Sequence, residues 1–249
     1  MQKEVCAFMI AFTDIHSHVL HGVDDGSKDI MTAVATLKTM RLMGVKNLIL
    51  TPHYCKRRGY ETSVEDIKKA YMELCNVCDE EDIGISLYLG TEMEYSTDAV
   101  RYIREGRVLT LADTKYILIE FAPYVSSATI SKACTEIMQL GIIPVIAHVE
   151  RYESIHSHFE LLYELKDKGV KFQVNIRSIC GARFGLKRFL KRIFSEEIAD
   201  FLAGDVHTYP IDRKEMEKCR KFFVKNASDK YFRKLLCENA EYILNGGQI

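Results

Sequence analysis

Histidine and acidic residues recur along this chain in short clusters. His16 and His18 stand two residues apart, and Asp205 and His207 form a second such pair. Five of the eight histidines share this setting with three carboxylates; the eight residues are His16, His18, His53, His148, His207, Glu92, Glu120 and Asp205. Imidazole and carboxylate together suit zinc, manganese or iron, and do not suit a metal bound by soft thiolates.

The spacing within the first cluster supports a metal site. On an extended segment, residues two apart point the same way, so His16 and His18 can hold one ion together. Several carboxylates beside several imidazoles also allow bridging between ions. Two neighbouring ions can activate a water and clamp the entering and leaving oxygens of a phosphoryl transfer. The pattern therefore indicates a metal site, and phosphoryl transfer is one reaction that such a site allows.

Two further residues are candidates for this site. Asp25 lies in the turn Asp24-Asp25-Gly26, which could be an ordinary turn, but the turn follows the His16/His18 pair closely enough for Asp25 to reach the site. Arg151 follows His148 by three residues. A surface salt bridge is its simple interpretation, yet a guanidinium here is well suited to bidentate phosphate binding.

Other polar residues are expected to lie outside the site. The segment 56–58, Lys-Arg-Arg, is either a solvated loop or an attractive surface for an acidic or phosphorylated partner. We expect Glu94 and Glu150 to point away, because they alternate with better candidates. The remaining histidines are expected to be structural or exposed; these are His21, His156 and His158.

Nearly all of the candidate ligands follow a short apolar run. Seven runs are predicted as strands, at 8–16, 47–51, 85–90, 116–121, 142–147, 171–175 and 201–205. Amphipathic patterns predict helices between them, at 30–43, 64–78, 127–140, 159–168 and 212–223. Strand–helix alternation predicts a parallel sheet with crossover helices. Seven units predict an α/β barrel one unit short of eight, whose carboxyl strand ends meet on one face.

Length and composition bound the class of protein. The 249 residues show no linker-like segment, which predicts one domain over 1–249. A net charge of -1 argues against nucleic acid as the partner. No apolar run approaches the roughly 20 residues of a membrane span, so no membrane insertion is expected. The short apolar segment 6–12 is interpreted as the start of the first buried strand.

The eight cysteines are scattered through apolar patterns, which is typical of free thiols in a reducing, cytoplasmic compartment. Cys75 and Cys78 form a lone CxxC with no second pair for zinc, so we expect two thiols on one helix. Cysteine-dependent tyrosine phosphatases need an arginine six positions after the nucleophile. None of the eight cysteines has one, so any tyrosine phosphatase activity here must use metals.

Taken together, the motifs resemble the polymerase and histidinol phosphatase (PHP) superfamily. More narrowly, they resemble its bacterial branch of manganese-dependent tyrosine-protein phosphatases, which act in capsule and exopolysaccharide biosynthesis. The motifs run in order over nearly the whole chain: Asp14-Ile-His-Ser-His18, Asp24-Asp-Gly26, Thr51-Pro-His53, Gly90-Thr-Glu92, Ile119-Glu-Phe121, Ala147-His-Val-Glu-Arg-Tyr152 and Asp205-Val-His207.

The resemblance implies a fold and a role for each residue of the site. The fold would be a distorted (β/α)7 TIM-like barrel with two or three Mn²⁺ ions, Fe or Zn being alternatives. The implied ligands of the first ion are His16, His18, Glu92 and Asp205. Glu92 would bridge to a second ion, which Glu120 and His148 complete. A third ion would be held by Asp25, His53 and His207. Arg151 and Asp205 are the implied catalytic residues, with Arg151 binding the phosphate, and hydroxide on the metal would attack phosphorus directly.

The resemblance also implies a partner, the phosphotyrosine-bearing tail of a bacterial tyrosine kinase. Three alternatives stay open: a small-molecule phosphatase such as one for histidinol phosphate, a non-catalytic metal-binding assembly module, and a nuclease or polymerase-associated role, which the charge balance disfavours. The chain starts upstream of the family's usual start, and Met9 is an alternative start. A homo-oligomer is compatible, although the first helix carries Ile30, Met31 and Ala33 where members often have a Glu/Arg-rich stretch.

Overall fold

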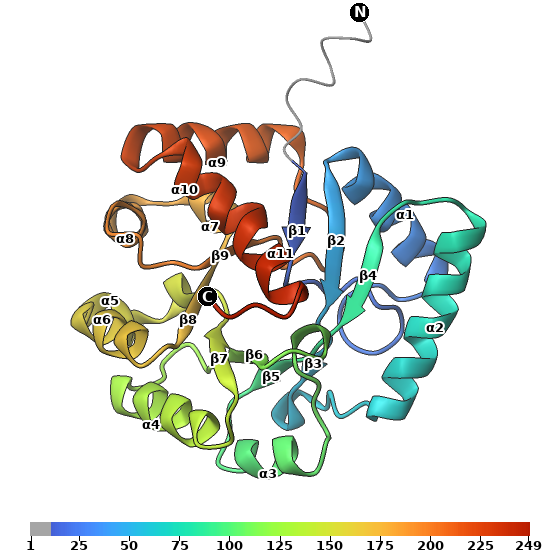
Figure 1. The fold of residues 1–249 in the computed structure, drawn as a ribbon, viewed down its shortest axis with the longest axis horizontal. Helices are drawn as coiled ribbons and strands as arrows, with labels where there is room; N and C mark the ends of the chain where they lie inside the picture. Colours follow the sequence, from blue (N-terminus) through green and yellow to red (C-terminus); the bar gives the residue numbers. More distant parts are fainter. Residues whose placement is uncertain (1–10) are drawn as a thin grey trace, which may run out of the picture.

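Short parallel strands form the centre of the protein in the computed structural model, which describes residues 11–249. Figure 1 shows these strands surrounded by helices. The strands are β1 (Phe12–Asp14), β2 (Val45–Leu50), β3 (His53–Tyr54), β4 (Ser86–Leu89), β5 (Glu92–Glu94), β6 (Tyr116–Glu120), β7 (Ile143–Ile146), β8 (Lys171–Asn175) and β9 (Phe201–Ala203).

These strands follow seven paths. Their order is β1-β2-β4 in one sheet and β3-β5-β6-β7-β8-β9 in the other, with every pairing parallel. Two residues separate β2 from β3, and two separate β4 from β5. The first break contains Pro52, which has no amide hydrogen for a ladder. Backbone bonds from Gly90 N to Leu50 O and from Glu92 N to Pro52 O keep the two interrupted paths adjacent.

A single parallel bridge between Ser17 and Val206 connects the outer edges of the two sheets. It is flanked by backbone hydrogen bonds from His18 N to Val206 O, 2.8 Å, and from Asp205 N to His16 O, 3.0 Å. The paths of β1 and β9 therefore meet at their carboxyl ends. The predicted seven-unit parallel α/β barrel is confirmed in its distorted form.

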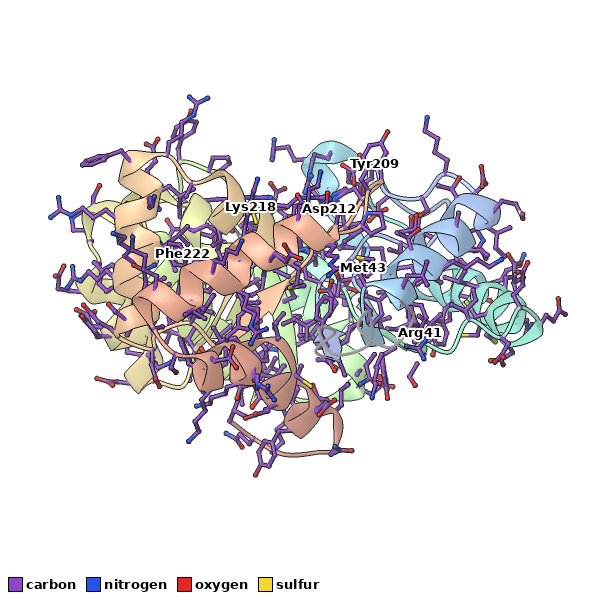
Figure 2. All side chains as sticks on the ribbon, turned by 90° about the horizontal axis from the view of Figure 1, so that it is seen from above. Arg41, Met43, Tyr209, Asp212, Lys218 and Phe222 are labelled. Atoms are coloured by element: carbon purple, nitrogen blue, oxygen red, sulfur yellow. The ribbon has the colours of Figure 1, made fainter. Side chains whose placement is uncertain are left out.

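Helices follow most of the strands. Their bounds are α1 (Ile30–Leu42), α2 (Val64–Glu80), α3 (Ala99–Arg104), α4 (Ser127–Met138), α5 (Glu153–Ser157), α6 (Glu160–Asp167), α7 (Ile176–Gly181), α8 (Phe184–Ser195), α9 (Arg213–Asn226), α10 (Asp229–Arg233) and α11 (Asn239–Leu244), and one π-helical turn (Lys234–Glu238) joins the last two. Short 3-10 turns lie at Lys56–Arg58, Leu111–Asp113 and Val149–Arg151. In Figure 2, α9 crosses the molecule between its labelled residues Asp212 and Phe222, and α1 ends near the labelled Arg41 and Met43.

Side-chain caps explain where several helices begin. Asp29, Ser63 and Ser126 each accept a hydrogen bond from a backbone amide three residues ahead. Asp212 opens α9 with a capping box, because Glu215 also bonds back to the Asp212 amide. Such caps satisfy amides that have no partner inside the helix.

Alternating strand residues divide the core into two layers. Along β6, Ile117 and Ile119 belong to the large cluster shared with the helices, whereas Tyr116 and Leu118 belong to a smaller one. That smaller cluster also contains Ile49, Val145 and Ala203 from other strands. A period of two is expected for strands buried on both faces, and the smaller cluster fills the inside of the curled sheet.

The predicted strands agree with the observed ones to within a few residues at each end. The first is observed only over Phe12–Asp14. The start of its predicted range 8–16, with Met9, and the start of the apolar segment 6–12, with Cys6, lie outside the described residues. Helices α3, α5, α7, α8, α10 and α11 were not predicted. In residues 11–249, no helix is both long and apolar enough to span a membrane.

Candidate metal centre

Every predicted ligand lies near the carboxyl end of one of the seven strand paths or in the loop that follows it, and in the β2/β3 and β4/β5 paths the ligand comes directly after the break. Glu120 is the last residue of β6 and Glu92 the first of β5, while His53 opens β3. Residue parity explains the orientation of Glu120, because it stands two residues beyond Leu118 of the interior cluster on the same strand. The strands thus direct side chains that are far apart in sequence toward one point.

Glu92 occupies the middle of the cluster. Its carboxylate oxygens lie 3.3 Å from Nε2 of His16 and 3.3 Å from Nε2 of His18. Nδ1 of His53 is 2.8 Å away and Nε2 of His148 is 3.0 Å away. All five of these side chains are buried. Glu92 is therefore placed to bridge between groups of ligands.

The other carboxylates surround this centre. Asp205 Oδ1 lies 3.4 Å from His16 Nε2 and 3.5 Å from His18 Nε2. Glu120 Oε1 lies 3.6 Å from His148 Nε2. Asp25, on its exposed turn, has Oδ1 3.5 Å from Nε2 of both His53 and His207. The structure consequently brings together all nine residues predicted as ligands.

Ligand atoms converge within 4.8 Å in three groups, which are His18, Asp25, His53 and His207; His16, His18 and Asp205; and His53, Glu92 and Glu120. Each group contains imidazole and carboxylate. His18 and His53 each belong to two groups, so the grouping is more interleaved than the one implied by the resemblance. His148 joins the cluster through its hydrogen bond to Glu92.

The donor atoms fit metal ions. Glu92 Oε2 is buried and makes no hydrogen bond of acceptable geometry to any described group, although two imidazoles face it. Nε2 of His16 and Nε2 of His18 face each other at 3.2 Å. Such groups are costly to bury unpaired. A cation between them would satisfy the oxygen and both nitrogens at once.

The electrostatics also favour cations. Burial, reinforced by the negative charge of Glu92, raises the pKa of Glu120 to about 7. Burial opposes the charged form of His16, yet Glu92 and Asp205 raise its pKa to about 9. Burial likewise opposes the ionised form of Asp205, but His16 and His18 hold its pKa well below the ordinary value. The carboxylates thus require nearby positive charge, which metal ions supply more densely than protons.

Backbone strain is concentrated at two of these residues. His148 has φ +33° and Asp205 has φ +49°, both in the left-handed region that non-glycine residues rarely adopt. Strain of this kind gathers at functional sites, where the surrounding structure holds it in place. Here the turns aim an imidazole and a carboxylate inward from the ends of β7 and β9.

Four residues that the sequence analysis did not assign to the site hold the ligands in position. Asp24 Oδ2 lies 2.7 Å from His18 Nδ1, and Gln173 Oε1 lies 3.1 Å from His16 Nδ1. The Tyr152 hydroxyl lies 3.3 Å from His148 Nδ1. Asn175 Nδ2 donates to Asp205 Oδ2 at 2.7 Å. The first three contacts engage Nδ1 and direct Nε2 of His16, His18 and His148 into the cluster, as partners of metal-bound histidines usually do.

A sequence signal for two of them exists. Gln173 and Asn175 are polar residues two apart on β8, the one predicted strand to which no site residue was assigned, and both are buried. Polar residues alternating within a buried strand must find partners. Asp24 and Tyr152, by contrast, carry no such signal. Each lies in a motif from which another residue, Asp25 or His148, was assigned to the site.

Two arginines border the cluster. Arg151 donates from a terminal nitrogen to Asp205 Oδ2 at 2.8 Å, and its side chain is 50% exposed. Arg58 donates to Glu120 Oε2 at 2.6 Å and also lies against the ring of His53. Arg151 was predicted for this place. Arg58 was not, since segment 56–58 was interpreted as either a solvated loop or a surface for a partner.

Apart from Arg58, the residues expected outside the site make their contacts elsewhere. Glu94 bonds to Arg57 and Cys55, and Glu150 accepts from the Asn175 amide. The other histidines contact Glu73 (His21), the Glu150 carbonyl and the Phe189 ring (His156), and the Ser154 carbonyl (His158). Cys75 and Cys78 are free thiols on α2.

A cavity of about 380 Å³ lies beside the cluster. Its wall includes Tyr54, Glu94 and Ala122, which stand one or two positions after His53, Glu92 and Glu120. Lys56 and Tyr102 also line it. The first three of these wall residues follow cluster residues so closely that the cavity lies near the ligand cluster. It offers aromatic and cationic groups next to the candidate metal centre.

Comparison with known proteins gives consistent matches. The model of the capsular polysaccharide synthesis CpsB/CapC family matches residues 12–245. The chain is 31% identical over 238 residues to the tyrosine-protein phosphatase CpsB of Streptococcus pneumoniae, covering 93% of this chain and 97% of that protein. It is 32% identical over 246 residues to the tyrosine-protein phosphatase YwqE of Bacillus subtilis, covering 95% and 92%.

Solved structures agree. A structure described for YwqE of B. subtilis and CpsB of S. pneumoniae, as unique metal-dependent tyrosine phosphatases, superposes with a TM-score of 0.83 at 28% identity, covering 95% of this chain and 96% of that one. A histidinol phosphate phosphatase of Lactococcus lactis, complexed with zinc, has a TM-score of 0.59 at 14% identity, covering 86% and 94%, and shares the fold. The family match spans all of the cluster residues, and the chain therefore belongs to the CpsB/CapC family of capsular polysaccharide synthesis.

Proposed function

We propose that the protein is a metal-dependent protein-tyrosine phosphatase. Its substrate would be the phosphotyrosine-bearing tail of a bacterial tyrosine kinase that regulates capsule or exopolysaccharide biosynthesis, acting in the cytoplasm through one domain over 1–249. The observation that carries the proposal is the convergence of nine imidazole and carboxylate side chains on one rim, with Arg151 bonded to Asp205 at its edge.

The assignment of roles follows from this geometry. When bound, the metal ions supply Lewis-acid charge and an activated water for attack on phosphorus. Asp205 directs Oδ1 toward His16 and His18 and Oδ2 toward Arg151, so it connects the ligand cluster to the guanidinium. Arg151 binds two phosphate oxygens and stabilises the charge that develops on them.

The openness of the rim supports a polypeptide substrate. Half of the Arg151 side chain is accessible, and His207 and Asp25 are also partly exposed. A phosphate on a tyrosine at the surface of another protein can reach such groups, and the adjoining cavity can receive the ring or a neighbouring residue. We propose manganese as the metal, with iron and zinc suited to the same ligands.

The proposal is tested by manganese-dependent hydrolysis of a phosphotyrosine peptide and of histidinol phosphate, measured side by side. We expect turnover of the peptide, its loss with a chelator, and a fall in kcat by about 10²- to 10³-fold in Arg151→Ala. Arg213→Ala, which removes an exposed arginine paired with Glu217 on α9, is the matched control and should be unchanged. Preference for histidinol phosphate would move the protein to small-molecule hydrolysis.

A further inference from the structure

Helix α8 carries a basic surface that the ligand cluster does not explain. Four cations of its sequence are exposed and form no ion pair within residues 11–249; they are Arg183, at the N-cap, and Lys187, Arg188 and Lys191. Phe184 stands among them and is 90% exposed. We call Arg183, Phe184, Lys187, Arg188 and Lys191 the α8 basic face. No acidic residue occurs between Arg183 and Ser195.

Repulsion between the like charges of this face lowers the stability of the protein on its own. Lys187 and Lys191 stand four residues apart, and Arg188 and Lys191 stand three apart, so like charges are neighbours on the helix surface. Arg192 also lies four residues beyond Arg188, although it pairs with Glu160 and Glu196. The protein as a whole has a net charge of -1. A concentration of unpaired positive charge on one helix of a nearly neutral protein is complementary to an anionic partner.

The topology places one end of this face at the active rim. Strand β8 ends at Asn175, which donates to Asp205 in the cluster. Helix α7 (Ile176–Gly181) begins immediately after that residue, and α8 begins three residues beyond α7. The chain then returns along α8 to the amino end of β9. Arg183 and Phe184 therefore form the rim end, and Lys191 lies about two turns, roughly 11 Å, farther down.

The buried side of α8 connects it to the segment that bears Arg151. Phe189 stacks on His156, with ring centroids 4.1 Å apart, and His156 in turn contacts the Glu150 carbonyl. Glu150 and Arg151 belong to the same 3-10 turn. Helix α8 is thus packed through its buried side against the segment that bears Arg151, and the α8 basic face lies on the solvent side of the same helix.

We propose that the α8 basic face binds an acidic stretch of the polypeptide that carries the phosphotyrosine, so that the substrate class is an acid-rich phosphotyrosyl segment. This inference rests on the proposed phosphatase function. A peptide with its phosphate at Arg151 can continue past the rim onto Arg183 and Lys187, while Phe184 packs against its apolar parts. The apolar side of α8, which includes Phe189, is buried in the core, so the helix cannot insert into a lipid surface, and a polypeptide is the occupant favoured.

The test compares two phosphotyrosine peptides that differ only in having glutamate or glutamine beside the phosphotyrosine. The variant is Lys187→Glu/Arg188→Glu/Lys191→Glu. Its matched control is Lys46→Glu/Lys115→Glu/Lys168→Glu, which has the same change of net charge on exposed lysines near the amino ends of β2, β6 and β8, away from the rim. A small aryl phosphate reports the chemistry without the flanking residues.

For the wild type with manganese, we expect a kcat/KM about tenfold higher for the glutamate peptide at low salt, as a few exposed ion pairs would give. The preference should disappear in the α8 variant and at high salt, and persist in the control. Hydrolysis of the aryl phosphate should not change. Equal kcat/KM for both peptides in the wild type, or a preference unchanged in the α8 variant, would overturn the inference.

A binding measurement separates this inference from the proposed function. Fluorescence anisotropy with the unphosphorylated glutamate and glutamine peptides does not require turnover. Tighter binding of the glutamate peptide, lost in the α8 variant, supports the acidic-segment site even if no phosphotyrosine is hydrolysed. Sedimentation with phosphatidylglycerol vesicles that depends on the α8 basic face, without any preference between peptides, would overturn the inference in favour of a membrane surface.

Discussion

At the scale of single residues, four of the five cluster histidines are oriented by a partner on Nδ1, whereas Nδ1 of His53 faces Glu92 itself. Nδ1 of His16, His18, His148 and His207 faces Gln173, Asp24, Tyr152 and the Asp205 carbonyl, respectively. A partner on Nδ1 selects the tautomer that presents Nε2 to a metal. Preorganisation of the ligands therefore depends on residues that need not touch the ion.

Asp24→Asn tests this dependence. Asp24 faces His18 Nδ1 and accepts from the His53 and Gly26 amides. An amide group would present a donor where other donors point. We expect metal affinity to fall about 10- to 100-fold, as is usual for such partners, measured by calorimetric titration with Mn²⁺.

The matched control for this substitution is Asp167→Asn, at the exposed end of α6. Its metal affinity should equal that of the wild type. Unaltered affinity in Asp24→Asn would mean that the orientation of His18 does not depend on Asp24.

At the scale of elements, the turn that carries Asp25 is fixed by a close backbone approach. Gly26 packs so tightly on His18 that an added Cβ would lie 1.8 Å from the His18 carbonyl oxygen. The Ser27 amide donates to the same oxygen. The turn is thus attached to the segment bearing the first two histidines, which brings Asp25 to within 3.5 Å of His53 and His207.

Gly26→Ala should consequently disturb both stability and the site. The clash involves backbone, which cannot move aside cheaply, so we expect the free energy of unfolding to fall by about 1–3 kcal/mol, with fewer metal ions bound per chain. Chemical denaturation and elemental analysis measure the two effects.

Gly181→Ala provides the comparison, because a Cβ there meets nothing within 4 Å. It should leave the free energy of unfolding unchanged or raise it by about 0.4–1 kcal/mol, because alanine reduces the conformational entropy of the unfolded chain. Equal stability of the two variants would contradict the packing explanation for Gly26.

At the scale of the whole molecule, the ligand cluster links elements from almost the full length of the chain. Its residues come from the ends of β1, β2/β3, β4/β5, β6, β7 and β9. The two sheets are otherwise joined at one edge by the single bridge between Ser17 and Val206. Metal ions held by this cluster would tie the two sheets together at the carboxyl rim.

Removal of metal should therefore lower thermal stability. A ligand that binds only the folded state at 100 times its Kd stabilises by about 2.7 kcal/mol. For a protein of this size, that amounts to a fall in Tm of about 5–10 °C, measured by scanning calorimetry with and without a chelator.

Arg151→Ala, which removes the arginine but none of the predicted ligands, should retain the same fall in Tm. A Tm that does not respond to chelation in the wild type would argue against stable ion binding. A response lost in Arg151→Ala would instead make Arg151 necessary for holding the metals.

Sequence alone determined the fold class and the membership of the cluster. Parallel strands buried on both faces must be continuous apolar runs, as in Ile143–Ile146. Their carboxyl ends are marked by the change from apolar to polar residues such as Glu120 and His148. Those residues could be assigned one strand at a time, since each signal is local. Most of the helices that sequence missed are short, whereas α8 carries an apolar stripe at Phe189, Leu190 and Ile193 that would have predicted it.

Only the tertiary structure decided how the ligands are shared and oriented. Gln173 and Arg58 contact His16 and Glu120 from distant segments, which depends on how the strands curl. Asp24 reaches His18 from only six residues away, through the fold of the loop between them. The strained backbone of His148 and Asp205 likewise has no local signature, because surrounding packing maintains it. Hydrogen-bond geometry among buried groups is a property of the assembled rim, and no single segment of the sequence contains it.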